Sequence, residues 1–309
     1  TKKYWKSQID LVINSIFIND YGNGIVPAIG LLRFIILSFA LAYYLKIENN
    51  KYEKKIYSFW ALVFIVVVFD IFFEYFFGHN ILNFKSNYPG RLASFTGSEL
   101  KIGGYCFGFF LLSLSFFYSF KKKIYYPLFI LFLIATLLIG ERSNFIKIFF
   151  ISSIFLFFTY KGPIIKKIFL FFLGITIILL VFVNNKHLKI RFYNEIFFSI
   201  KDVGLINYLK TNKHGIHYVT SMEIIKQNKL FGVGFKNFRN ESFKDKYNIN
   251  NIRSGWAPHP HQIHFEILSE LGITGYFLII LFFIYYIING FIIYKKNSNL
   301  YILSSTLFI

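Results

Sequence analysis

Three histidines lie close together in the segment HPHQIHFEILSELGITG near the end of the chain: His259, His261 and His264. Imidazoles at short spacing raise the question of zinc, which takes three or four protein ligands. Pro260 disrupts helical spacing between them, and no carboxylate or cysteine supplies a clear further ligand. We therefore expect no bound metal here, and a histidine alone in a loop is usually just solvated.

Two further segments carry cations with similar potential. Arg91 lies in GRLASFTGSEL, which also contains Glu99, and Arg142 lies in the short sequence GERSN between two apolar blocks. Charge-assisted hydrogen bonds from arginine suit a phosphate or diphosphate ligand. Two alternatives stay open, because arginines near helix ends are often interfacial anchors and because Glu141 can neutralise the adjacent Arg142.

The elements that must position these residues are membrane spans. The 309 residues are 55% hydrophobic and 16% charged, with a mean hydropathy of +0.52. A hydrocarbon layer needs about 20 consecutive apolar residues. Such blocks predict spans at 25–45, 56–77, 102–120, 124–139, 145–159, 168–184 and 273–294, with a further one beginning near Leu300. The two short blocks, 124–139 and 145–159, are expected to pair at a tight turn around Gly140–Asn144.

The fold class that follows is all-α: a polytopic helical membrane protein with about seven or eight transmembrane helices. The single cysteine, Cys106, excludes an intrachain disulfide and is expected to be a packed side chain. The chain begins at Thr1 and stops within an apolar run at Ile309, so we expect it to be a piece of a longer protein.

Lysine distribution predicts the orientation. Four expected loops on one side carry twelve lysines, whereas the alternate short loops, 78–100 and 140–144, carry three basic residues. The positive-inside rule places the lysine-rich loops in the cytoplasm. The 78–100 and 140–144 loops and the long 185–258 segment then lie outside, on the face that also receives the histidines. The formal charge of +19 is explained in this way, and we expect no nucleic-acid partner.

The long outer segment is expected to hold short helices over the mouth of the bundle. Tyr218–Lys229 has helical periodicity, with Met222, Ile225 and Val219 on one side, and Leu230–Asn237 is a glycine turn. The predicted organisation is therefore 1–184, N-terminal membrane helices with outer loops; 185–260, periplasmic loop region; and 261–309, motif helix and C-terminal membrane helices.

Helix geometry separates the charges of the histidine segment. If Pro260 starts a helix, His261, His264 and Leu268 share one face, and Glu266 and Glu270 point away to cap the helix or pair with loop lysines.

Charges also lie deeper in the expected spans. Arg33 lies about 12 Å below the outer end of the first span. Asp70 and Glu74 lie at similar depth in the second span. An Arg33–Asp70 pair would offset the cost of burying either charge, and a ligand-binding role for Arg33 is the alternative.

These segments together resemble a family. HQIHFEILSELGITG, from His261 to Gly275, resembles the signature of bacterial O-antigen ligases and polymerases, in which a histidine opens a helix ending in Glu-Leu-Gly-x-x-Gly. KQNKLFGVGFKNF is similar to that family's glycine-turn element, with Lys229 where proline is usual. GERSN resembles its arginine turn, and FDIFFEYFFGHNILN followed by GRLASFTGSEL is similar to its first outer segment, with Arg91 and Glu99 at the charged positions.

The chain departs from the family pattern at two places. The family usually has an arginine just before the helix that leads to the glycine turn. In this chain that place falls near Lys213-His214, which keeps a cation but not the bidentate binding of an arginine. Gln262 stands where asparagine often follows the motif histidine.

The resemblance implies a metal-independent glycosyltransferase without a cofactor, with about a dozen membrane helices in the whole protein. It would work at the periplasmic face of the bacterial inner membrane, among membrane lipids. The donor would be a glycan on undecaprenyl diphosphate, and the acceptor a sugar hydroxyl of lipid A–core for a ligase or of another repeat unit for a polymerase.

The resemblance also implies roles for the residues. His261 would act as general base, because an imidazole takes a proton near neutral pH. Arg91 and Arg142, with Lys213 or His214, would hold the diphosphate, and Glu99 would orient an arginine or the acceptor.

Two other functions are compatible with the same cations: a flippase or transporter of lipid-linked glycan, and a non-catalytic assembly partner that binds it. A transporter should show inverted repeats and polar residues at mid-membrane. The sequence has no visible repeat and its polar clusters fall at the outer rim, so transport is the lesser alternative.

Overall fold

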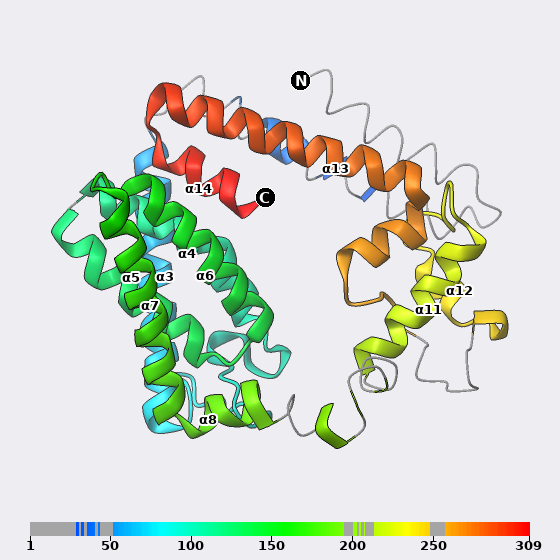
Figure 1. The fold of residues 1–309 in the computed structure, drawn as a ribbon, viewed down its shortest axis with the longest axis horizontal. Coiled ribbons are helices and arrows are strands. Elements are labelled where there is room, and N and C mark those ends of the chain that lie inside the picture. The colour runs from blue at the N-terminus through cyan, green and yellow to red at the C-terminus, as the bar shows by residue number, and fades with distance from the viewer. Residues whose placement is uncertain are drawn as a thin grey trace. The chain divides into compact units, whose positions relative to one another are not determined.

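The computed structural model describes residues 52–120, 122–194, 213–247 and 257–309, together with 29–30, 32–33, 36–40, 43, 200–202, 204 and 207. Every regular element within these residues is helical (Figure 1). The chain divides into two compact units. One comprises Thr1–Asn49 with Ile200–Tyr285, and the other Asn50–Ser199 with Tyr286–Ile309.

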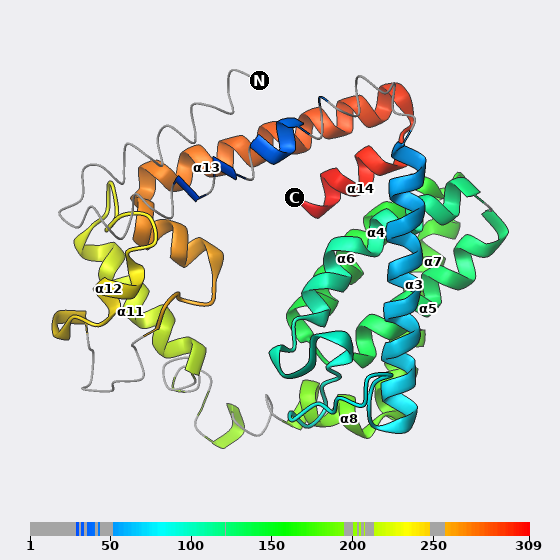
Figure 2. The same cartoon turned by 180° about the vertical axis from the view of Figure 1, so that it is seen from behind.

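The unit containing Asn50–Ser199 is a helical bundle. Its α-helices and short helical turns are α3 (Glu53–Phe77), η1 (Ser94–Glu99), α4 (Ile102–Phe120), α5 (Lys122–Leu138), α6 (Arg142–Thr159), α7 (Ile164–Asn184), α8 (Lys186–Leu188), η2 (Lys189–Asn194) and α14 (Leu300–Phe308). Figure 2 shows α3, α4 and α6 side by side in this unit. Helices dominate because hydrogen bonds within each helix satisfy the backbone without water, as a bilayer requires.

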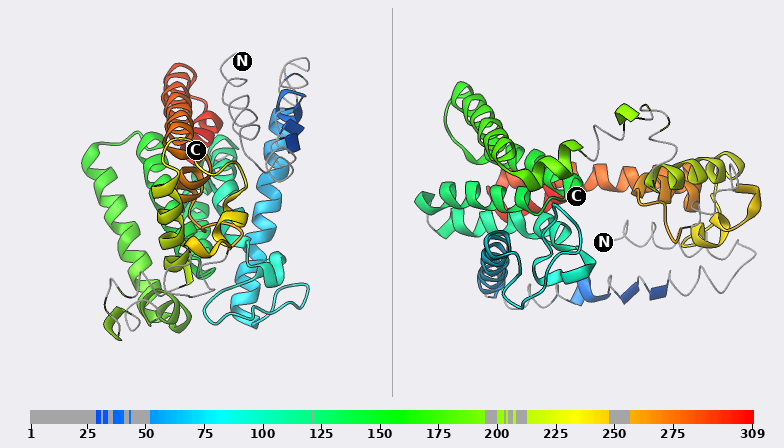
Figure 3. Two further views of the ribbon diagram at one scale, coloured as in Figure 1. Left: turned by 90° about the vertical axis from the view of Figure 1, so that its right-hand side faces the viewer. Right: turned by 90° about the horizontal axis from the view of Figure 1, so that it is seen from below.

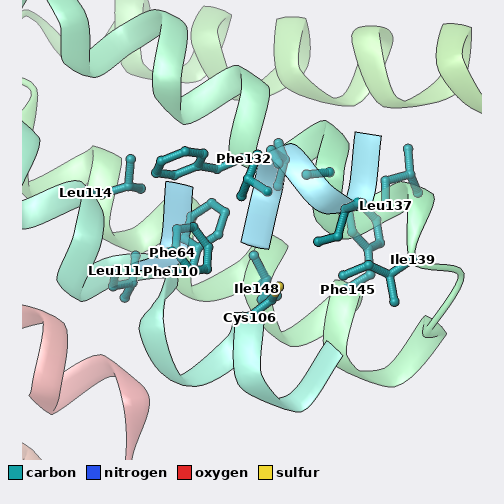
Figure 4. Packing of buried hydrophobic residues seen from close by; sticks show 14 of the residues in the cluster. Phe64, Cys106, Phe110, Leu111, Leu114, Phe132, Leu137, Ile139, Phe145 and Ile148 are labelled. Carbon is teal, nitrogen blue, oxygen red and sulfur yellow. The ribbon is translucent and has the colours of Figure 1, made fainter. Parts of the chain in front are cut away.

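Aromatic side chains hold the centre of this bundle together. Phe64 of α3 lies edge-on against Phe132 of α5, with ring centroids 4.9 Å apart, and both are fully buried beside Phe110 of α4 (Figure 4). Cys106 is buried in the same cluster, as predicted. Such close contacts matter because dispersion between side chains drives helix association in lipid.

Five helices of the described residues are long and apolar enough to cross a membrane: Lys54–Phe77, Ile102–Phe120, Arg142–Thr159, Ile164–Asn184 and Ile263–Asn297. They confirm a helical membrane protein with several spans. The expected 25–45 span lies largely outside the described residues, and the total of seven or eight stays a prediction. α5 is a shorter apolar helix, and it meets α6 at the expected tight turn around Gly140.

The unit containing Ile200–Tyr285 holds α11 (Lys213–Gln227), α12 (Phe238–Ser242), η3 (Asp245–Tyr247) and the first part of α13 (Ile263–Asn297). Tyr218 of α11 stacks on Phe265 in the first turns of α13, with ring centroids 5.3 Å apart, and the yellow and orange helices lie together in Figure 3. Short helices in the outer segment were predicted. Met222 is 48% exposed, whereas Ile224 of α11 is fully buried with Phe238, so the buried side of α11 is not the side that carries Met222.

Candidate active site

Two buried carboxylates of α3 hold the loop between α3 and α4 that carries Arg91. Asp70 accepts hydrogen bonds from the Ile81 N–H (2.9 Å) and the Ser94 hydroxyl (2.5 Å). Glu74 accepts from the backbone N–H groups of Ala93 (3.0 Å) and Ser94 (2.6 Å). Because buried carboxylates are costly unless hydrogen-bonded, these contacts fix the loop to the end of α3.

These contacts bear on the expected pairing of the deep charges. Asp70 is fully buried and is satisfied by its own loop, so its burial does not need the predicted pair with Arg33. Arg33 is an exposed helical residue of the other unit. Its proposed ligand-binding role stays a prediction.

Arg91 is tied to the turn before α6. Its Nη2 donates to Glu141 Oε1, in an ion pair that joins residues fifty positions apart, and to the Leu100 carbonyl oxygen at 3.2 Å. The Arg91 side chain is 20% exposed, and its buried Nε–H has no acceptor among the described residues. The guanidinium is therefore positioned by the protein and remains partly exposed.

The two outer turns touch through their backbones as well. The Leu92 N–H donates to the Ile139 carbonyl oxygen at 3.1 Å. Gly140 has a positive φ of 77°, and a Cβ there would overlap the Gly90 carbonyl oxygen. Only glycine suits this close approach at this conformation.

Glu141 does not form its ion pair with the adjacent Arg142, the partner that the sequence analysis considered. It pairs with Arg91 and accepts a 2.5 Å hydrogen bond from the Asn144 side chain. Arg142 follows as the first residue of α6 and is half-buried. The turn therefore brings Arg91, Glu141 and Arg142 to the same end of the bundle.

Glu99 does not contact an arginine in this arrangement. Its side chain is 65% exposed and forms a 2.6 Å ion pair with Lys101. The hydrogen bond and positive charge of Lys101 lower the pKa of the Glu99 carboxyl. Its suggested role in orienting an arginine therefore has no contact to support it, and a role toward the acceptor stays a prediction.

His261 belongs to a histidine cluster in the other unit. Its ring centroid lies 4.2 Å from that of His259 and 5.3 Å from that of His217 on α11. Sequence reasoning did not identify His217. The one signal for it was its place one helical turn after Lys213-His214.

The helix expected to begin at Pro260 begins instead at Ile263. Gln262 explains this start, since its side-chain oxygen accepts the Phe265 N–H at 2.7 Å. His261 precedes the helix with a positive φ of 59°, so it does not share a helical face with His264. The ring of His264 faces Tyr276, with Nδ1 and the hydroxyl 3.1 Å apart.

The glycine turn and the motif helix interlock through their backbones. The N–H groups of Val233 and Gly234 donate to the carbonyl oxygens of Ser269 (2.9 Å) and Glu270 (2.7 Å). In return, Ile273 donates to the Lys229 carbonyl oxygen at 2.9 Å. The two motifs that the sequence presents separately are therefore one structural unit.

Gly272 permits this interlock by breaking the helix. It has φ 66° and ψ −171° inside α13, where Figure 1 shows a bend. A Cβ on Gly272 would lie 2.6 Å from the Gly232 nitrogen and closer still to Leu230. Gly272 therefore allows the backbone to turn and to pack closely at a place where no Cβ fits.

The motif glutamates bind the loop, as predicted, and not His261. Lys236 Nζ lies 2.7 Å from Glu266 Oε1, and its backbone N–H donates to the buried Glu270 carboxylate at 2.8 Å. Burial acts to lower the pKa of Lys236, but the hydrogen bond from Glu266 and the charges of both glutamates outweigh it, so the net pKa is raised.

Lys213 and His214 are the first two residues of α11, one turn before His217, and their side chains lie outside the described part of the structure. Their role stays a prediction. Within the residues that the structure describes, no group of three or more His, Cys, Asp or Glu side chains could hold a metal ion.

The spans and the polar turns at their ends define a multi-pass helical membrane protein. Residues 127–280 of this protein match the family model of the O-antigen ligases, a glycosyltransferase-type family. The match contains the Arg142 turn, the glycine turn and the His261 helix, and it supports the family that those motifs indicate. Among the curated proteins, none matches the chain.

Proposed function

We propose that this protein is a membrane glycosyltransferase of the O-antigen ligase or polymerase type. It would transfer a glycan from undecaprenyl diphosphate to an acceptor sugar hydroxyl at the periplasmic face of the inner membrane. The observation that carries the proposal is the Arg91–Glu141 pair beside Arg142, within a chain whose residues 127–280 match the O-antigen ligases.

The arginines would stabilise the leaving diphosphate. Negative charge grows on the diphosphate oxygen as its bond to the anomeric carbon breaks, and pre-positioned cations stabilise that charge without reorganising. Glu141 holds Arg91 in place, and the partial exposure of the Arg91 side chain supports a ligand contact. Arg142 would supply a second cation, and Lys213, His214 and Arg33 are the further candidates.

His261 would accept the proton of the acceptor hydroxyl as that oxygen bonds to the anomeric carbon. Its exposed position before α13 leaves the ring accessible, and His259 and His217 support its orientation. The step balances: one glycosidic bond forms, the sugar–diphosphate bond breaks, and the proton moves to imidazole. The chemistry needs no metal, because the arginines supply the positive charge.

Transfer by the purified full-length protein tests the proposal. The assay contains lipid-linked glycan and either lipid A–core or a lipid-linked repeat unit, with a chelator and without nucleotide. We expect glycan transfer to one acceptor and its loss in His261→Ala. His264→Ala is the matched control, because His264 contacts Tyr276 and lies outside the ring cluster. Equal rates in His261→Ala and wild type would refute the general-base role.

A further inference from the structure

A polar pocket lies at the helix ends where the lysine-rich loops meet the bundle, opposite to the ends that carry Arg91 and Arg142. It is a cavity of about 710 Å³ in the unit formed by Asn50–Ser199 and Tyr286–Ile309. The start of α3, the ends of α4, α6 and α13, and the start of α14 all contribute to it. None of the residues proposed for glycan transfer lines it.

The charge of this pocket is entirely positive among the residues that line it. Lys54 and Lys161 are both exposed, and no Asp or Glu belongs to the lining. Neither lysine forms an ion pair within the described structure. Two uncompensated ammonium groups at one cavity favour an anion as its occupant.

Amide groups complete a wall suited to phosphate. Ser115 and Ser119 of α4 and Asn297 and Asn299 near the end of α13 line the same cavity. The hydroxyls of Ser115 and Ser119 already donate to the carbonyl oxygens of Leu300 and Phe116. The side-chain amides of Asn297 and Asn299 therefore supply the hydrogen-bond donors for phosphate oxygens, while the lysines supply charge.

The pocket wall is fastened by contacts between helices. The rings of Tyr57 on α3 and Tyr301 on α14 stack with centroids 3.8 Å apart. Tyr118 donates to the Thr159 carbonyl oxygen at 3.3 Å, which joins α4 to α6. The cavity is therefore built by the fold, and it does not depend on a single loop.

Its position relative to the apolar spans identifies the source of the anion. Lys54 opens an apolar span and Lys161 follows another, so the pocket lies where a bilayer presents its headgroups. Basic pockets between membrane helices on the cytoplasmic side bind anionic lipid headgroups. A cavity of this volume also exceeds what one inorganic phosphate would fill.

We infer that the pocket at Lys54 and Lys161 binds the phosphate-bearing headgroup of an anionic phospholipid from the cytoplasmic leaflet. The bound lipid would join α3, α4, α6 and α13 at that end of the bundle. This inference rests on the membrane spans and is independent of glycan transfer.

Lipid retention measures the site directly. The purified protein, in neutral detergent, is titrated with phosphatidylglycerol or phosphatidylcholine, and bound lipids are counted by native mass spectrometry. We expect preferential retention of phosphatidylglycerol. The double variant Lys54→Gln/Lys161→Gln should weaken it by about tenfold to thirtyfold, from the loss of two lysine contacts.

The matched control is Lys295→Gln/Lys296→Gln, which removes two lysines from the same end of α13 but none from the pocket lining. Retention should be close to wild type in this control. Equal weakening in both double variants would overturn the site in favour of diffuse surface attraction.

Competition with inorganic phosphate and with glycerol 1-phosphate distinguishes a lipid headgroup from a free phosphate as the bound anion. Neither should displace the lipid at millimolar concentration. Displacement by inorganic phosphate would show a free-phosphate site and overturn the lipid assignment. His261→Ala should retain phosphatidylglycerol normally, so failure of the transferase proposal and failure of the lipid proposal are distinguishable.

Discussion

Arg91 and Glu141 form an ion pair that joins two outer turns separated by fifty positions in the chain. The pair is partly buried, and Glu141 is held in turn by Asn144. It links the segment after α3 to Glu141, the residue just before α6. The two arginines proposed to bind diphosphate are thereby attached to one rigid turn.

Removing the charge of Glu141 should therefore weaken substrate binding through the position of Arg91. Glu141→Gln leaves the shape of the side chain but loses the charge, and we expect glycan transfer to fall by roughly tenfold and the free energy of unfolding by about 2 kcal/mol. Initial rates over a donor titration and thermal unfolding measure both. Glu223→Gln is the control, since its exposed partner Lys226 makes an ordinary surface pair. An unchanged donor KM in Glu141→Gln would contradict the role given to Arg91.

Gly272→Ala should disrupt the interlocked motifs. Its positive φ and its contact with Gly232 leave no room for a Cβ, so we expect a loss of at least about 2 kcal/mol of stability. The lowered melting temperature is measurable by differential scanning fluorimetry. Gly174→Ala on α7 is a matched control with nothing within 4 Å of the added Cβ, and it should be neutral or slightly stabilising. Similar melting temperatures for the two variants would refute the interlock.

The Lys236–Glu266 pair should make stability depend on alkaline pH. Because the pKa of Lys236 is raised, its contribution is complete at neutral pH, below the pKa of the unfolded chain, and is lost as pH rises through the folded pKa. The difference in melting temperature between wild type and Lys236→Gln should therefore be constant up to about pH 9 and shrink as the pH rises above about 10.4, through the raised pKa of Lys236. A difference independent of pH over that interval would show that packing, and not charge, accounts for it.

His217 should act through the position of the His261 ring. His217→Ala removes a ring 5.3 Å away and is expected to lower kcat by roughly tenfold with donor KM unchanged. His217→Phe keeps a ring and should recover most of that loss. Measuring kcat and donor KM for both variants tests the positioning role of His217. If His217→Phe is as slow as His217→Ala, His217 has a hydrogen-bonding or acid–base role instead.

Local patterns in the sequence were sufficient for several features of this fold. Apolar runs predicted the helices α3, α4, α6 and α7, because a span needs uninterrupted apolar length. The sequence also predicted that Glu266 and Glu270 pair with the loop lysines and not with His261. The positions of Lys213 and His214 were visible only as a departure from a family motif.

Other features depend on which groups meet in space. Arg142 is next to Glu141 in the sequence, whereas Arg91 is fifty positions away. The packing of the two turns makes Arg91 the ion-pair partner of Glu141. Asp70 could be assigned an arginine partner from its depth alone, but its own loop supplies the hydrogen bonds. The helix start at Ile263 and the burial of Ile224 in place of Met222 were also decided by contacts that the local pattern does not contain.

The sequence by itself thus determined the membrane class, the order of the spans and the motifs that carry His261, Arg91 and Arg142. Tertiary structure alone decided the Arg91–Glu141 pair, the His217–His261 contact and the lysine pocket. The physical reason is that hydropathy and helical periodicity act over a few turns of one helix. Ion pairs, ring contacts and cavities depend on side chains that folding brings together from distant positions.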